Sequence, residues 1–176
     1  GRIPAFVGAA EAADRLAALD TWKRAEVVKA NPDRAQLPVR IHALDAGKIL
    51  YMAVPKLAAE RPFYVLDPGA LDVPISEAAT SAVASRIART ADVDALRPVD
   101  VVVCGSVAVN HEGVRLGKGA GYSDIEVALL ADAGLLTAQT TIATTIHDVQ
   151  VVDEPLPHAG HDFTVDVIVT PTTVLT

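Results

Sequence analysis

The sequence contains few of the residues on which several common protein classes depend. Cys104 is the only cysteine among 176 residues, so an intrachain disulfide and a thiolate-rich metal site are both excluded. No stretch approaches the ~18 consecutive apolar residues of a membrane-spanning helix, and no secretory signal is visible. We therefore expect a cytoplasmic protein without a membrane anchor. Because the chain begins at Gly1 without a methionine, we also expect an N-terminal segment to be missing.

Aromatic residues are scarce at 4%, although 51% of the chain is hydrophobic. The core must therefore consist mainly of Val, Ile, Leu and Ala, a composition typical of parallel sheets covered by helices on both faces. A length of 176 residues fits one domain. The net charge of −7 counts against a dedicated nucleic-acid-binding module, which usually carries a basic face.

Hydrophobic periodicity predicts helices and strands that alternate along the chain. The predicted helices cover residues 8–19, 38–46, 76–89 and 125–133, and the predicted strands cover residues 25–29, 49–54, 63–66, 99–104, 140–146 and 163–169. This order predicts a single-domain, three-layer α/β/α sandwich with a mostly parallel sheet. Ligands of such sheets bind outside the carboxyl ends of the strands, which directs attention to the segments after Val28, Val54, Cys104 and Ile146.

A glycine-rich segment follows the most strongly predicted strand. Gly117, Gly119 and Gly121 alternate, so the backbone can turn tightly and expose successive N–H groups. Arg115 and Lys118 add positive charge, which suits a phosphate. The spacing matches neither a Walker A loop nor a dinucleotide-binding fingerprint. The segment predicts a nucleotide phosphate site, and the alternative is a loop whose glycines only permit turns.

The helix after this loop carries its own start signal. Ser123 and Glu126 have the S-x-x-E spacing of a capping box, and a helix starting there would direct its positive end at the glycine loop. Asp124 would lie in the first turn, where it could simply complement the helix dipole. Beside a phosphate, the same carboxylate is a candidate Mg²⁺ ligand.

Two blocks of the sequence resemble a known family. Residues 115–124, RLGKGAGYSD, resemble the R-x-G-x-G-x-G-Y-Y-D loop of 5-formyltetrahydrofolate cyclo-ligases, and residues 150–170 are similar to the Q-x-V…L-P…H-D…L-D…V-T ending of that family. Residues 2–9 and 28–34 resemble the branch of methenyltetrahydrofolate synthetase domain-containing proteins. The resemblance implies a NagB/RpiA/CoA transferase-like fold, with ATP and Mg²⁺ as cofactors and a reduced folate as the small-molecule substrate.

The resemblance also implies roles for particular residues. Lys118 and Tyr122 would act at the phosphoryl-transfer site, and Asp124 and Asp162 would hold Mg²⁺. The expected ATP-binding residues are Arg115, Gly117, Lys118, Gly119, Gly121 and Tyr122. In the family, ATP phosphorylates the formyl oxygen of 5-formyltetrahydrofolate, and ring closure gives 5,10-methenyltetrahydrofolate.

Further candidates for substrate contact lie near the ends of predicted strands. They are Lys29, Asn31, Gln36, Lys56 and His147. Four of them have a structural alternative: turn chemistry for Lys29 and Asn31, a solvated side chain for Lys56, and a surface or helix-capping role for His147.

Two positions depart from the family pattern. Ser123 replaces the second tyrosine of the loop motif, and Gln36 stands where the family has an acidic residue. Three functions therefore stay open: an active cyclo-ligase, an ATP-dependent ring-closing enzyme for another small molecule, and a non-catalytic nucleotide- or folate-binding module.

Overall fold

A large mixed sheet forms the centre of the molecule in the computed structural model, which describes residues 2–57, 60–119, 121–160 and 162–176. Within these ranges its eight strands have the order β11-β10-β8-β5-β1-β2-β3-β4. The five strands from β10 to β2 run parallel to one another, whereas β11 pairs antiparallel with β10 at one edge, and β3 and β4 continue antiparallel from β2 at the other. The strands are β1 (Val27–Ala30), β2 (Ile49–Ala53), β3 (Phe63–Leu66), β4 (Arg89–Ala91), β5 (Val99–Cys104), β8 (Leu136–Thr145), β10 (Val167–Val169) and β11 (Val174–Leu175).

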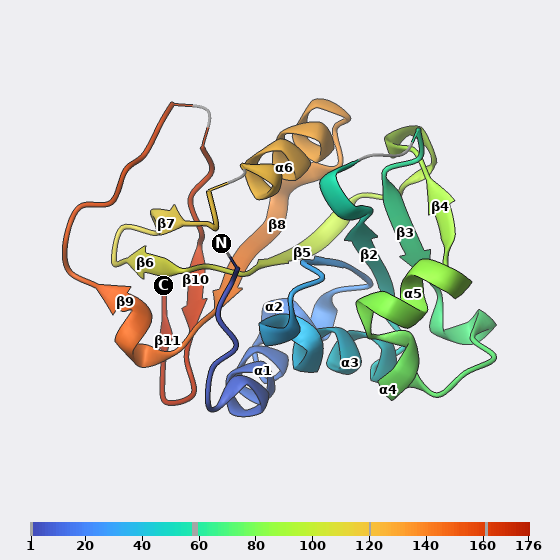
Figure 1. Ribbon diagram of the computed structural model, residues 1–176, viewed down its shortest axis with the longest axis horizontal. Helices are drawn as coiled ribbons and strands as arrows, with labels where there is room; N and C mark the ends of the chain where they lie inside the picture. The colour runs from blue at the N-terminus through green and yellow to red at the C-terminus, as the bar shows by residue number, and fades with distance from the viewer. Residues whose placement is uncertain (1, 58–59, 120, 161) are drawn as a thin grey trace.

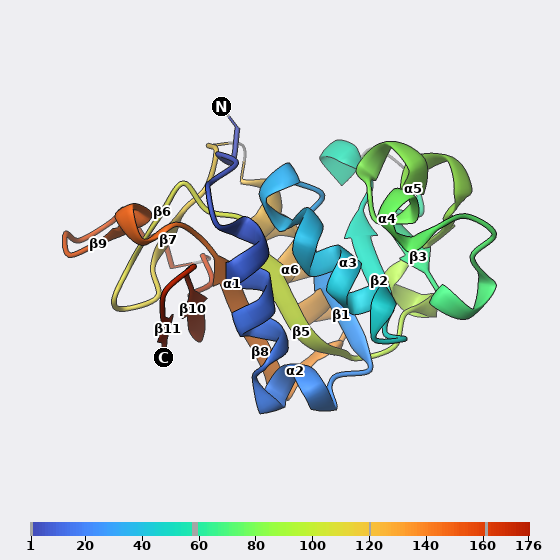
Figure 2. The ribbon, with the colours of Figure 1, turned by 90° about the horizontal axis from the view of Figure 1, so that it is seen from below.

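Helices cover both faces of this sheet, as Figures 1 and 2 show. Helices α1 to α5 lie on one face and α6 lies on the other. The α-helices are α1 (Ala9–Ala17), α2 (Asp20–Arg24), α3 (Leu37–Asp45), α4 (Ile75–Ala78), α5 (Ser81–Ile87) and α6 (Tyr122–Asp132). Short 3-10 turns connect the elements at η1 (Arg34–Gln36), η2 (Pro55–Leu57), η3 (Pro68–Ala70), η4 (Val93–Ala95) and η5 (Asp148–Gln150). The predicted three-layer α/β/α arrangement with a mostly parallel sheet is confirmed, and no described helix has the length and apolarity required to span a bilayer.

Neighbouring residues of the central strands pack into opposite halves of the core. Val28 and Val101 belong to the cluster beneath α1, α2 and α3, whereas Val27 and Val102 belong to the cluster that contains Leu130 of α6. This division follows from the alternation of side chains along a strand. Because both strand faces are buried, these strands consist mostly of apolar residues, with Lys29 and Asp100 as the exceptions.

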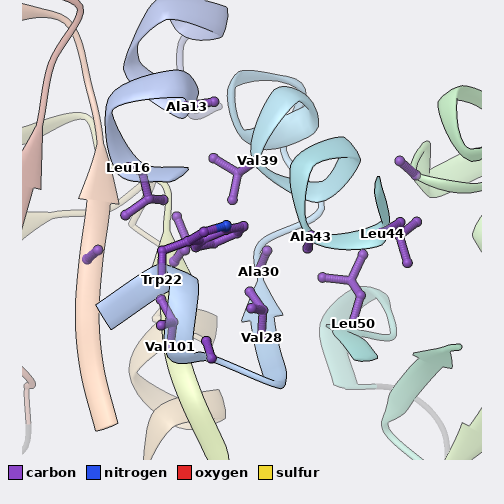
Figure 3. Packing of buried hydrophobic residues seen from close by; sticks show 14 of the residues in the cluster. Ala13, Leu16, Trp22, Val28, Ala30, Val39, Ala43, Leu44, Leu50 and Val101 are labelled. Atoms are coloured by element: carbon purple, nitrogen blue, oxygen red, sulfur yellow. The ribbon is translucent and has the colours of Figure 1, made fainter. Parts of the chain in front are cut away.

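Trp22 fills the space between the first helices and the sheet. Its ring lies between α1 and α3 on one side and strands β1 and β5 on the other (Figure 3), and the residue is only 3% exposed. Lys48 places its ammonium 5.6 Å from the ring centroid and donates to the Ala25 carbonyl at 2.6 Å. Burial lowers the pKa of Lys48, because charge is disfavoured away from water.

A small second sheet lies beside the main one. It has the order β7-β6-β9, formed by β6 (Ala108–Asn110), β7 (Arg115–Leu116) and β9 (Val151–Val152). Strands β6 and β7 make an antiparallel hairpin between β5 and the glycine loop. These short strands were not predicted from the sequence, and they mean that the glycine loop leaves β7 and not β5.

Two predicted elements differ from the structure. The helix expected over residues 76–89 is divided into α4 and α5, because Thr80 adopts an extended backbone and its hydroxyl accepts a hydrogen bond from the Val83 amide at 3.3 Å. The chain then continues into β4. The strand predicted over residues 163–169 is confined to β10. Before β10 the backbone pairs with another segment, because the Val165 amide donates to the carbonyl of Gly113 at 2.8 Å.

Candidate active site

A cavity of about 670 Å³ opens at the carboxyl ends of β1 and β2. Its volume lies within the range of small-molecule sites, roughly 300–1,000 Å³. The wall consists of residues 31–33, 53–55, 115–119 and 121–124, together with Ile3, Ser81, Glu126, Pro157 and Asp162. The predicted ligand edge is thus hollowed after β1 and β2, whereas the segment after β8 does not contribute to the described wall.

The glycine loop forms one side of this cavity. Gly119 and Gly121 have φ angles of +97° and +72°, a region that glycine enters without the steric cost of a side chain. Gly121 is the N-terminal cap residue of α6, so the loop leads directly into the first turn of an 11-residue helix. The first N–H groups of a helix lack intrahelical partners, and together with the exposed Lys118 they provide a setting suited to a phosphate group.

Arg115 is held in a fixed orientation at the cavity wall. Its Nη2 donates to the Gly105 carbonyl at 2.7 Å and its Nε donates to Ser106 Oγ at 3.2 Å. The guanidinium carbon also lies 5.4 Å from the centroid of the Phe163 ring. These contacts connect the end of β5 to β7 and place a permanent positive charge beside the glycine loop.

Both predicted metal-binding carboxylates line the same cavity. Asp124 lies in the first turn of α6, and Asp162 accepts a hydrogen bond from the Ala159 amide at 2.8 Å. The described residues contain no group of three or more acidic, histidine or cysteine side chains arranged to hold a metal. Mg²⁺ typically takes only one or two protein carboxylates and completes its shell with phosphate oxygens and water, so this donor set fits Mg²⁺ bound together with a nucleotide.

The predicted capping box at Ser123 and Glu126 is wrong. Both residues lie inside α6, which begins at Tyr122 after its cap residue Gly121 and has no side-chain cap. Glu126 forms a buried ion pair with Lys29 of β1, and Ser123 Oγ accepts a hydrogen bond from Asn31 Nδ2 at 3.2 Å. The two side chains therefore join α6 to the end of β1.

Arg40 supports the cavity without lining it, and no pattern in the sequence singles this residue out. Its guanidinium donates to the carbonyls of Asn31 at 2.6 Å, Asp33 at 2.7 Å and Ala79 at 2.8 Å. The residue is 1% exposed. Burial lowers the pKa of Arg40 to about 10, and the Asp33 carboxylate partly opposes this change. Arg40 thus stays charged at neutral pH and fixes the loop after β1 relative to the α4–α5 junction, which precedes the wall residue Ser81.

The predicted substrate contacts are divided by the structure. Asn31 lines the cavity, whereas Lys29, Gln36 and His147 are absent from its described wall. Gln36 is fully buried and donates to the carbonyl oxygen and hydroxyl of Thr145 at 3.2 and 3.0 Å. His147 caps η5, where its Nδ1 accepts from the Val149 amide at 3.1 Å. The side chain of Lys56 lies outside the described part of the structure.

Comparison with protein families decides the ancestry of the chain. The model of the 5-formyltetrahydrofolate cyclo-ligase family matches residues 3–171. The chain belongs to this family. Its likeness to methenyltetrahydrofolate synthase domain-containing proteins is also clear, at 39% identity to the protein of Bos taurus and 40% to that of Mus musculus, over 99% of this chain in each case. These matches cover 47% and 48% of the two relatives, so this cyclo-ligase-family chain spans about half the length of the curated relatives it matches.

Solved structures support the fold of this cyclo-ligase-family chain. The 5,10-methenyltetrahydrofolate synthetase of Aquifex aeolicus superimposes with a TM-score of 0.63 at 23% identity, covering 96% of this chain and 80% of that one. The 5,10-methenyltetrahydrofolate synthetase of Mycoplasma pneumoniae gives a TM-score of 0.57 at 14% identity, with coverages of 93% and 84%. At these identities the likeness establishes the architecture.

Proposed function

We propose that the chain is an ATP-dependent cyclo-ligase that converts 5-formyltetrahydrofolate to 5,10-methenyltetrahydrofolate. The observation that carries the proposal is one cavity whose wall contains a glycine loop, a helix N-terminus, two basic residues and four carboxylates, among them Asp124 and Asp162. Phosphoryl transfer requires mainly positioning and neutralisation of charge. This set of residues meets both requirements, and family membership supplies the reaction class.

In the proposed reaction, the formyl oxygen attacks the γ-phosphorus of ATP and ADP leaves. The neighbouring N10 then attacks the activated formyl carbon, the C–O bond breaks, phosphate departs with the oxygen, and N10 loses its proton. The formyl oxygen is thereby converted from a poor leaving group into phosphate. Excluding water from the phosphoryl-transfer step is important, because water would compete with the formyl oxygen for the phosphoryl group.

Particular residues are proposed for each part of this chemistry. The backbone of the glycine loop and the Arg115 and Lys118 side chains would hold the phosphates, with Lys118 neutralising charge on the transferred group. Asp124 and Asp162 would hold Mg²⁺, which supplies further neutralisation between the phosphates. Tyr122 lines the cavity beside them and would position the reacting end of the folate.

The test measures ADP release from Mg-ATP with and without 5-formyltetrahydrofolate, together with the absorbance of the methenyl product. Folate-dependent formation of both products is the expected result. Asp124→Asn should raise the Mg²⁺ concentration needed for half-maximal turnover about tenfold or more, while the matched control Asp132→Asn, an exposed position at the end of the same helix, should leave it unchanged.

Two other outcomes would reject the proposal in favour of an alternative. ATP turnover that is independent of folate would indicate a different small-molecule substrate, a result that the departure at Ser123 would accommodate. Nucleotide binding without any turnover would indicate a non-catalytic binding module.

A further inference from the structure

A continuous polar network lines the inner wall of the cavity. Lys29 forms its ion pair with Glu126 and also donates to Asn31 Oδ1 at 3.0 Å. Asn31 Nδ2 in turn donates to Ser123 Oγ at 3.2 Å. Lys29, Asn31 and Glu126 are 1%, 4% and 6% exposed, so all three are more than nine-tenths buried. Nevertheless, Asn31, Ser123 and Glu126 all contribute to the cavity wall.

This network has hydrogen-bonding capacity beyond its internal bonds. An ionised carboxylate accepts at about four positions, and Lys29 contacts only Oε1 of Glu126. The Asn31 amide carries a second N–H beyond the one that contacts Ser123. The Ser123 hydroxyl accepts from Asn31 and keeps its own proton to donate. The wall therefore presents the Glu126 carboxylate as an acceptor next to Asn31 and Ser123 as neutral donors. The buried Lys29 ammonium balances the charge of the carboxylate.

That arrangement matches one kind of heterocyclic edge. A carboxylate pairs best with two adjacent N–H donors, which it accepts in parallel. The amino-pyrimidinone ring of a reduced pterin presents such a pair, an exocyclic amino group and a ring N–H, followed by a carbonyl acceptor. Adenine presents only one N–H group beside an acceptor nitrogen, so it would leave one carboxylate oxygen without a partner.

We infer that Glu126, Asn31 and Ser123 recognise the amino-pyrimidinone edge of the folate ring, with Lys29 as the positioning residue that holds Glu126. The inference rests on the proposed cyclo-ligase function and assigns the orientation of its substrate. Glu126 accepts the two N–H groups, and Asn31 and Ser123 donate toward the carbonyl. The glycine loop and the first N–H groups of α6 are left to the phosphates of ATP.

The test uses a fragment that contains only the ring, 5-formyltetrahydropterin, which lacks the aminobenzoyl-glutamate tail. Isothermal titration of wild type and Glu126→Gln with this fragment, and separately with Mg-ADP, measures the two halves of the cavity independently. We expect the Kd of the fragment to rise about ten- to hundredfold in Glu126→Gln, since a charged hydrogen-bonding partner is lost. The Kd of Mg-ADP should stay within about twofold of wild type, because the inference gives Glu126 no contact with the nucleotide or Mg²⁺.

Two further variants separate recognition from folding. Glu126→Gln leaves the buried Lys29 ammonium without its counter-charge, so the double variant Lys29→Met/Glu126→Gln restores charge balance and should show the same selective loss. Ser123→Ala removes one donor without disturbing the ion pair, and should weaken fragment binding by about three- to tenfold. Asp132→Asn serves as the control that carries an altered carboxylate on the same helix.

Each outcome has a defined meaning. If the wild type binds the fragment and neither the double variant nor Ser123→Ala weakens it, the inference is overturned while the proposed function stands. If Mg-ADP binding weakens in its place, the network faces adenine, and the inference is again overturned. If the wild type binds Mg-ADP but neither binds the fragment nor forms methenyl product, the proposed function and the inference fail together.

Discussion

Replacement of Arg40 by methionine should destabilise the protein strongly, although Arg40 lies outside the cavity. The substitution keeps much of the side-chain volume and removes all three hydrogen bonds to the carbonyls of Asn31, Asp33 and Ala79. A broken hydrogen bond to a charged group costs about 1.5–3 kcal/mol. The three bonds share one donor group and are not additive, and removal of the guanidinium also removes the cost of burying its charge.

We therefore expect Arg40→Met to lower the free energy of unfolding by about 3–5 kcal/mol, similar to the loss of one partner of a buried ion pair. For a chain of this length that corresponds to a melting temperature lower by about 10 °C. Urea unfolding followed by circular dichroism measures the effect. The control is Arg86→Met on the exposed face of α5, which should stay within about 0.5 kcal/mol of wild type. A difference between the two variants below about 1 kcal/mol would refute the assigned role of Arg40.

Further predictions concern backbone fit, thiol reactivity and acid stability. Gly113→Ala should cost more than about 2 kcal/mol by thermal melting, because Gly113 has φ +81° and a Cβ there would lie 2.3 Å from the Val165 carbonyl oxygen; an unchanged melting temperature would contradict this. Cys104 is buried and burial raises the pKa of its thiol, so a disulfide reagent should modify it in urea but not in the native protein at neutral pH, and rapid native labelling would disprove it. Hydrogen bonds from Thr170 and Thr172 lower the pKa of Asp148 below 3.8. The stability from this group is present above pH 3.8 and is lost as the pH falls through the folded-state pKa. Asp148→Asn should therefore reduce the fall in unfolding free energy at acid pH. An unchanged fall would count against the assignment.

The features that local sequence could predict are those with local causes. The run from Val99 to Cys104 predicts a buried strand because both faces of a parallel sheet are covered. The alternating glycines predict the loop beside the cavity, since left-handed backbone angles favour glycine. The three-layer architecture was predicted correctly from the alternation of hydrophobic periodicities. Of the four segments where a ligand was expected, those after β1 and β2 line the cavity.

The errors arise where distant residues decide the outcome. The S-x-x-E spacing at Ser123 and Glu126 fits a capping box. In the structure, however, Glu126 pairs with Lys29 on β1, and Ser123 accepts a hydrogen bond from Asn31, which directly follows β1. Arg40 interrupts an apolar helical pattern. A single basic residue in a helix does not indicate that it will donate hydrogen bonds to three carbonyls in two separate loops. Gln36 lies close to the predicted edge in the sequence, yet its amide points to Thr145, a partner 109 residues away.

The order of the strands in the main sheet has a consequence for folding. Strand β1 pairs with β2 nearby in sequence, but its other neighbour is β5, and its polar end meets α6 across a separation of 97 residues between Lys29 and Glu126. Contacts between residues so far apart form slowly, because closing a long loop costs entropy before any contact compensates for it. The cavity wall combines residues 31–33 and 53–55 with residues 115–119 and 121–124, so it is complete only after this long loop has closed. Ligand binding should therefore appear only with the final assembly of the sheet, and ligand should selectively slow the global unfolding of the chain.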